Sequence, residues 1–200
     1  ADEIKLVDYA LGIFGTKMLA VVGGNHDYRT YQQSGLDHLR WLADREKVHY
    51  APDELSLILE IVDPRNTDDV TARYHIALRH QYRRHSFLNP LHACWRYLEE
   101  RIGEWPLGSD GGEMIPDVIA IGHHHVAAVG SESRPNKRIW AARFGAWQWE
   151  SGYSRAKGFR HSAPTAPSFV FWPHREREPW GSEYYEEALT MLRMWRQQAA

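Results

Sequence analysis

The chain has 200 residues, of which 43% are hydrophobic and 25% charged, a balance typical of a globular protein with a buried core. The formal net charge of -2 argues against a generally basic nucleic-acid surface, although a local basic patch is compatible with it. The single cysteine, Cys94, excludes an internal disulfide and fits a reducing compartment, and no apolar run is long enough to span a membrane. We therefore expect a cytoplasmic protein without a membrane-spanning segment.

The first half of the chain alternates predicted helices and strands. Amphipathic spacing predicts a helix at the start, and short runs rich in Val, Ile and Leu predict strands. Clusters of Gly, Pro, Asn and Asp predict the turns. The predicted elements are a helix over 1–14, a strand over 18–22, a polar loop over 28–33, a helix from the N-cap Ser34 to about Lys47 with Leu36, Leu39, Trp41 and Leu42 on its apolar side, a strand over 48–51, and a hairpin of strands 55–62 and 72–80 with its turn over 63–69.

The second half follows the same alternation. Asn89 and Pro90 are suited to start a helix, with Pro near its first turn. The predicted elements are a basic, polar loop over 81–90, a helix over 91–101, a loop over 103–116, a strand over 116–121, a turn over 130–136, a strand over 138–147, a long loop over 151–167, a strand over 168–172 and a final helix over 182–197 with Tyr185, Ala188, Leu189, Leu192 and Trp195 toward the core.

Polar side chains that can bind metals follow the first predicted strand. Gly23 and Gly24 come directly after it and allow a sharp turn, which presents Asn25, His26 and Asp27 in a row. In open α/β sheets, functional sites lie just outside the carboxyl ends of strands. Asn25 could also serve only as a turn residue, because Asn tolerates unusual backbone angles.

Two later strands end in the same way. The strand over 116–121 is followed by Gly122 and three histidines, and in an extended segment His123 and His125 would point to one side and His124 to the other. The strand over 74–80 ends in His80. Three strand ends that carry Asn or His predict one shared metal site.

These motifs, in this order, resemble the calcineurin-like metallophosphoesterases over about residues 17–125. The resemblance rests on Gly-Asn-His-Asp at 24–27, a strand-end His80, and Gly-His-x-His at 122–125. It implies a fold of the α/β class, an αββα sandwich of two mixed sheets, with 1–200 forming a single, partial domain. It also implies hydrolysis of phosphate mono- or diesters by two divalent ions, with Mn favoured among Mn, Fe, Zn and Ni, and a metal-bridging hydroxide as the nucleophile.

The resemblance also implies residue roles. Asn25, His80 and His123 would bind the second metal and His125 the first, while His26 would donate a proton to the leaving oxygen. Asp27 would orient His26 or a ligand. His80 has two competitors, His75 on the other side of the strand and His85 in the following loop.

Three arginines are candidate contacts of the substrate phosphate, namely Arg79, Arg83 and Arg84. A solvated surface is the alternative interpretation of these residues. The loops over 28–33, 81–89 and 151–167 are expected to shape the choice of substrate.

Part of the family pattern is missing from this sequence. No Asp has His two positions later and none follows a Gly, so the family's Asp-x-His and Gly-Asp-x-x-Asp motifs are absent. We interpret the chain as starting part-way through a domain, with early strands of the sheets lost. Three neutral ligands without a carboxylate predict that these 200 residues bind Mn²⁺ or Zn²⁺ poorly and hydrolyse phosphodiesters negligibly.

Two alternatives stay open. The first is a nuclease of the same superfamily that processes DNA ends, which the arginines allow and the net charge does not favour. The second is a degenerate, non-catalytic binding or structural protein. The expected partner is a phosphoester substrate, and the sequence does not indicate an oligomeric state.

Overall fold

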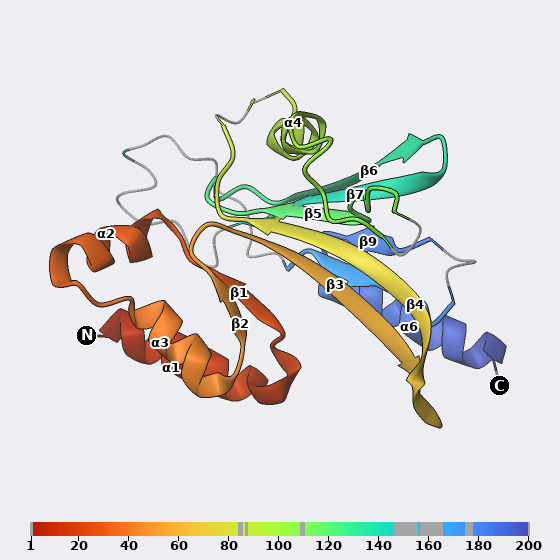
Figure 1. Ribbon diagram of the computed structural model, residues 1–200, viewed down its shortest axis with the longest axis horizontal. Helices are drawn as coiled ribbons and strands as arrows, with labels where there is room; N and C mark the ends of the chain where they lie inside the picture. Colours follow the sequence, from red (N-terminus) through yellow and green to blue (C-terminus); the bar gives the residue numbers. More distant parts are fainter. Residues whose placement is uncertain are drawn as a thin grey trace. The chain divides into compact units, whose positions relative to one another are not determined.

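The computed structural model describes residues 2–83, 86, 88–108, 111–145, 156, 166–174 and 178–199. The chain folds into two compact units (Figure 1). The first unit comprises Ala1–Leu55 with Leu78–Gln81, and the second comprises Ser56–Ala77 with Tyr82–Ala200. The fold is of the mixed α/β class, as the sequence predicts. Within the described residues, no helix is both long and apolar enough to cross a membrane.

The first unit contains a small parallel sheet with helices. Strands β1 and β2 pair in parallel, with Ala20 opposite His49 and Val22 opposite Ala51. The chain between these two strands passes through two helices, which makes a βαβ crossover. The elements are α1 (Asp2–Phe14), the 3₁₀ turn η1 (Gly15–Lys17), β1 (Ala20–Val22), α2 (Asn25–Ser34), α3 (His38–Glu46) and β2 (His49–Ala51).

Helix α2 contradicts the prediction of a polar loop over 28–33. The Asp27 carboxylate accepts a hydrogen bond from the Gly24 amide at 2.8 Å, which caps the amino end of this helix. Gly35, with a φ of 71°, closes the other end by donating its amide to Tyr31 O at 2.7 Å. None of the α2 residues is buried, so no apolar period reveals this helix in the sequence.

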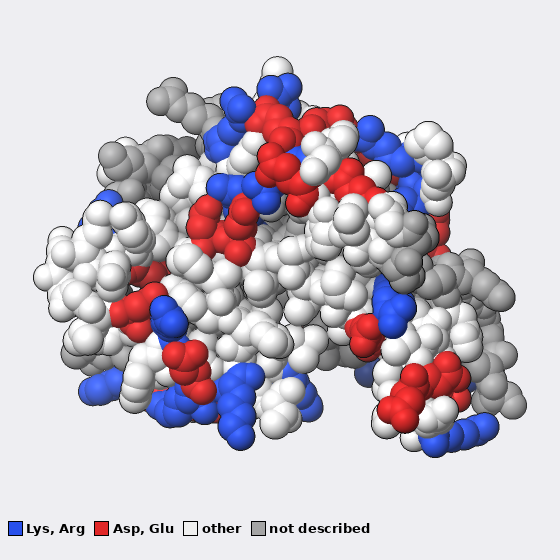
Figure 2. All heavy atoms as spheres, viewed as in Figure 1, with Lys and Arg blue, Asp and Glu red and all other residues white. Residues whose placement is uncertain are grey.

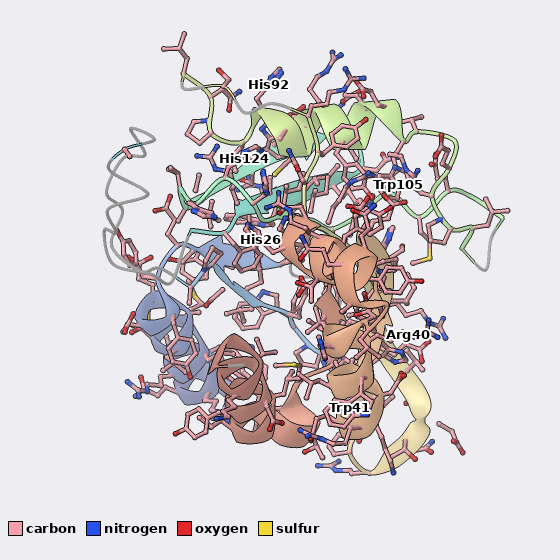
Figure 3. The ribbon with its side chains drawn as sticks, turned by 90° about the vertical axis from the view of Figure 1, so that its left-hand side faces the viewer. His26, Arg40, Trp41, His92, Trp105 and His124 are labelled. Atoms are coloured by element: carbon pink, nitrogen blue, oxygen red, sulfur yellow. The ribbon has the colours of Figure 1, made fainter. Side chains whose placement is uncertain are left out.

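Helix α3 has a different cap and a narrower apolar side than predicted. Its N-cap is Asp37, whose Oδ1 accepts a hydrogen bond from the Arg40 amide at 2.9 Å, whereas Ser34 is the last residue of α2. Leu42 and Ala43 are buried. Trp41, which α3 carries beside Arg40 (Figure 3), is exposed and so is Leu36, which precedes α3, so neither belongs to a buried apolar side of the helix as predicted.

The second unit is built around a mixed five-stranded sheet in the order β3-β4-β5-β7-β6. Strand β5 is parallel to β7, and β6 is antiparallel to β7. The remaining elements are α4, a two-stranded antiparallel sheet of β8 and β9, and α6. Their bounds are β3 (Glu54–Asp63), β4 (Asn66–Arg79), α4 (His92–Glu100), β5 (Val118–Ile121), β6 (Ala128–Arg134), β7 (Lys137–Arg143), β8 (Ser168–Val170), β9 (Trp180–Ser182) and α6 (Tyr185–Ala199).

The main core of this unit lies between α4 and the sheet. Helix α4 packs against β5 and β7 (Figure 1), and its buried side includes Cys94 and Leu98. Ile119, Ile121 and Ile139 face it from the strands. All four residues of β5 are buried, as expected for a central strand with both faces covered.

Three predicted boundaries in the second unit are wrong. The hairpin turn is confined to residues 64–65, because residues 66–69 already belong to β4. The predicted turn over 130–136 is mostly strand β6, whose residues alternate between exposed and half-buried, as in a half-covered edge strand. Ser182 ends β9 instead of starting the last helix, and it accepts a hydrogen bond from the Tyr184 amide at 3.0 Å.

The last helix only partly matches its predicted core side. Ala188 is buried with Val170 and Trp172, and Trp195 packs against this group. Tyr185 and Leu192 are exposed, which contradicts their predicted core positions. Strand β7 ends at Arg143, so the predicted strand over 138–147 is too long at residues 144 and 145. Residues 146–147 and nearly all of the loop over 151–167 lie outside the described residues.

Candidate functional site

The first group of candidate residues lies at the carboxyl end of β1. Gly23 extends the pairing with β2 by donating its amide to Ala51 O at 2.8 Å. Gly24 is then the extended N-cap of α2, with φ -125° and ψ 178°. Asn25 is therefore the first residue of a helix that starts directly after a parallel strand, a place where α/β proteins commonly bind ligands.

The structure brings two predicted metal ligands together. His80 Nε2 lies 2.9 Å from Asn25 Oδ1. The His80 backbone is fixed by a 2.9 Å hydrogen bond from its amide to Asp53 O. A Cβ at position 24 would lie only 2.7 Å from His80 Cε1, so a glycine is needed for the imidazole to reach Asn25.

The chemistry of this pair fits one edge of a metal site. The amide oxygen of Asn25 can only accept, so His80 Nε2 carries the proton in the 2.9 Å hydrogen bond. Two ligand atoms at adjacent positions around a metal ion, each about 2.1 Å from the ion, lie about 3 Å from each other. A divalent ion could thus take the place of this proton with little movement of the two side chains.

The two other residues of this motif have different surroundings. Asp27 uses its carboxylate to cap α2, and no hydrogen bond joins it to His26 within the described part of the chain. His26 lies in the first turn of α2 (Figure 3), is exposed, and lines a cavity of about 180 Å³ together with Thr30, His38 and the Asp27 side chain. Asp27 also lines a cavity of about 640 Å³.

The second group follows β5 in the second unit and is not extended, contrary to our expectation. The His124 amide donates to Gly122 O at 2.9 Å, and His123 between them has a φ of 70°. This is a γ-turn with a positive φ at its centre, the rarer and more strained of the two forms. His125 also has a positive φ, 57°. Two strained non-glycine residues in one short loop are a common feature of functional sites.

His75 is a core residue. It is fully buried, and its ring nitrogens contact Ser56 Oγ at 2.5 Å and the carbonyl oxygen of Met114. Burial lowers the pKa of His75 below its ordinary value, against an opposing contribution from the Met114 carbonyl. These contacts account for His75 as a satisfied interior histidine. The other competitor of His80, His85, lies outside the described residues.

The candidate arginines have carboxylate partners. Arg79 pairs with Asp53 at 2.8 Å and also with Glu54. Arg83 pairs with Glu100 at 2.7 Å. Arg84 lies outside the described residues. On the face drawn in Figure 2, the basic side chains over α4 lie among acidic ones. Arg96 pairs with Glu100 and Arg134 with Glu99.

Sequence reasoning overlooked one residue at the carboxyl end of the second sheet. Arg143 ends β7 and is buried, with 2% of its surface exposed. The sequence does carry a signal for this residue, because Arg143 is the single charge within the otherwise apolar run Ile139–Phe144. Charged residues are almost never fully buried without a partner.

Among the described residues, no group of three or more His, Cys, Asp and Glu side chains is arranged to hold a metal ion. The Asn25–His80 pair is therefore the part of the predicted site that the structure assembles within one unit, while His123 and His125 belong to the other unit. No known protein-family model matches the chain, and a search of curated proteins finds no significant match.

Proposed function

We propose that this chain carries part of a metal-dependent phosphoesterase site that hydrolyses phosphate mono- or diesters. The observation that carries the proposal is the 2.9 Å approach of Asn25 Oδ1 and His80 Nε2, two residues 55 positions apart that the motif order pairs as ligands. The strained loop at His123 and His125 supports it. We also propose that the α/β fold belongs to a calcineurin-like sandwich of two mixed sheets.

The proposed ligands are neutral. Asn25 and His80 would hold one divalent ion, and His123 and His125 are the further ligands that the resemblance implies. When bound, two such ions supply Lewis acidity and lower the pKa of water, which is the chemistry that phosphoester hydrolysis requires. Because none of these four side chains carries a negative charge, we propose that the 200 residues alone bind Mn²⁺ weakly and hydrolyse phosphodiesters negligibly.

The chain's own residues would position the metal ligands and protonate the leaving group. Gly24 gives the His80 ring room beside Asn25, and Asp27 fixes the start of α2, from which Asn25 and His26 project. His26 is exposed and would donate a proton to the leaving oxygen of the ester. We also propose a cytoplasmic location, since the one cysteine is unoxidised and buried.

The test joins this chain to a segment that supplies the Asp-x-His and Gly-Asp-x-x-Asp motifs and follows hydrolysis of bis(p-nitrophenyl) phosphate with Mn²⁺. Proton donation typically contributes about 10²–10⁴-fold to a rate, so His26→Ala should lower kcat by that order while the bound metal stays unchanged. His92→Ala, an exposed histidine of α4, is the matched control and should retain full activity. Loss of metal in His26→Ala would make His26 a ligand, and absence of turnover in the joined protein would refute the proposed function.

A further inference from the structure

Arg143 lies at the carboxyl end of β7, beside the carboxyl end of β5, where the loop of His123–His125 begins. Strands β5 and β7 are parallel, with Ile121 directly opposite Arg143, so their carboxyl ends lie together. The next residue, Phe144, donates its amide to Ile121 O at 3.0 Å, which continues this register. In open α/β sheets, ligands bind at this edge.

The guanidinium of Arg143 is enclosed by protein. Its Nε donates to Val126 O at 2.6 Å, which ties the side chain to the chain segment after His125. Its Nη1 is buried and has no hydrogen-bond partner within the described residues. An arginine carries five donors, and leaving a charged one unsatisfied in the interior is costly.

No counter-charge for Arg143 is found in the described part of the chain. The neighbouring ionisable group is the Cys94 thiol, whose pKa burial raises to about 12. This thiol is therefore uncharged near neutral pH and cannot offset the guanidinium. Burial also lowers the pKa of Arg143 below its ordinary value, but an arginine stays protonated in proteins.

An apolar residue would suit this position better if it served packing alone. Residues 139 and 141 share the strand face of Arg143, and Ile139 and Ala141 are fully buried in the core under α4. Replacing buried charges by apolar residues of similar size is often neutral or stabilising. The charge at position 143 therefore needs an explanation other than packing.

We propose that Arg143 binds an oxyanion of the phosphate class, through its Nη groups, at the carboxyl end of β5 and β7. Guanidinium is matched to two oxygens of a phosphate, and its Nε bond to Val126 O fixes the orientation of the fork. The buried Nη1 is the donor that the oxyanion would satisfy. In the context of the proposed function, on which this assignment of substrate chemistry rests, the oxyanion is the phosphoryl group of the ester.

The experiment measures binding of inorganic phosphate to the full chain by calorimetry, with EDTA present so that no metal contributes. Charge-assisted hydrogen bonds contribute about 1.5–3 kcal/mol, so Arg143→Gln should weaken phosphate binding roughly ten- to a hundredfold. Arg138→Gln is the matched control, since Arg138 lies on the same strand, is exposed and pairs with Glu178. It should bind phosphate as the unchanged chain does.

A measurement on the unchanged chain covers the case in which Arg143→Gln does not fold. The guanidinium ¹⁵N signals of Arg143 should shift when phosphate is added and should stay fixed with chloride at equal ionic strength. Equal phosphate affinity in Arg143→Gln and the unchanged chain, or unmoved Arg143 signals, would overturn the proposal. Phosphate binding through Arg143, together with no ester hydrolysis by the chain joined to the segment that supplies the missing motifs, would refute the proposed function and leave phosphate binding by Arg143 standing.

Discussion

At the scale of single residues, the Asn25–His80 contact is the strongest support for a metal site. It depends on Gly24, because the imidazole occupies the space that a side chain at position 24 would fill. The polar pair at the strand end therefore keeps its close contact only while position 24 has no side chain. A turn residue without a partner would not need this close approach.

Gly24→Ala tests that dependence. The added Cβ would lie 2.7 Å from His80 Cε1, so the ring must move away from Asn25. We expect a loss of about 1–3 kcal/mol in the free energy of unfolding from this crowding, together with weaker Mn²⁺ binding. Urea unfolding and Mn²⁺ titration measure the two effects.

Gly12→Ala is the control for that substitution. Gly12 lies inside α1, and a Cβ there would meet no atom within 4 Å. It should raise the free energy of unfolding by about 0.5–1 kcal/mol, because Ala is the better helix former. If Gly24→Ala behaved like Gly12→Ala, the close approach of His80 to Gly24 would be wrong.

At the scale of elements, the loop after β5 stores strain. A γ-turn with a positive φ at a non-glycine residue costs of order 1–3 kcal/mol and persists only where the rest of the structure enforces it. His123 occupies this position, and its ring packs edge-on against His124, with 5.2 Å between ring centroids. A glycine would adopt this backbone conformation without strain, so the imidazole is present at a cost in stability.

We expect His123→Gly to be more stable than His123→Ala by about 1 kcal/mol, the reverse of their order in a helix. Both variants lose the same imidazole, so their difference isolates the backbone conformation. Thermal unfolding of the two purified variants measures it. Equal stability, or a more stable His123→Ala, would show that position 123 is not strained in solution.

The elements that the sequence predicts well are those with a regular pattern of apolar residues. The strands that become β1, β2 and β5, the helix α4 and the hairpin of β3 and β4 all carry apolar patterns, and the structure confirms their existence. Helix α2 and strands β6 and β9 are not predicted as such. Helix α2 has no buried residue and is held by its caps, and β6 consists of small and charged residues whose pairing with β7 decides their conformation.

The candidate site divides in a similar way. Motif order and strand ends predicted that Asn25 and His80 would meet, and they do. The γ-turn at His123 depends on backbone geometry that residue types do not encode. No sequence motif includes Arg143, and its significance comes from its burial with no counter-charge among the described residues.

At the scale of the whole molecule, the chain comprises two compact units that each carry part of the motif set. The first unit holds Asn25 and His80, and the second holds His123 and His125. The second unit also has a buried polar cluster, in which the Asp117 carboxylate accepts the His75 amide at 2.8 Å and lies 3.3 Å from Lys137 Nζ. This cluster joins β4 to β7 through Asp117, the residue before β5, so protonation of His75 should affect unfolding of the unit.

Stability should fall in mildly acidic solution because of His75. Burial lowers its folded-state pKa below the ordinary 6.5, so between these two values the unfolded chain binds a proton that the folded chain does not. The contribution of neutral His75 is fully present above pH 6.5 and is lost as the pH falls toward the folded pKa. NMR titration of the His75 ring should give a pKa below 6.5, and a value at or above 6.5 would contradict the buried, neutral state.

The central claim is that Asn25 and His80 are ligands of one divalent ion. Its most direct test is Mn²⁺ binding to the chain, followed by electron paramagnetic resonance, in the unchanged protein, Asn25→Ala, His80→Ala and the control His92→Ala. We predict weak binding that His92→Ala retains and that Asn25→Ala and His80→Ala each reduce at least tenfold, about 1.4 kcal/mol. Binding that both substitutions leave unchanged, or no binding by the unchanged protein, would contradict the claim.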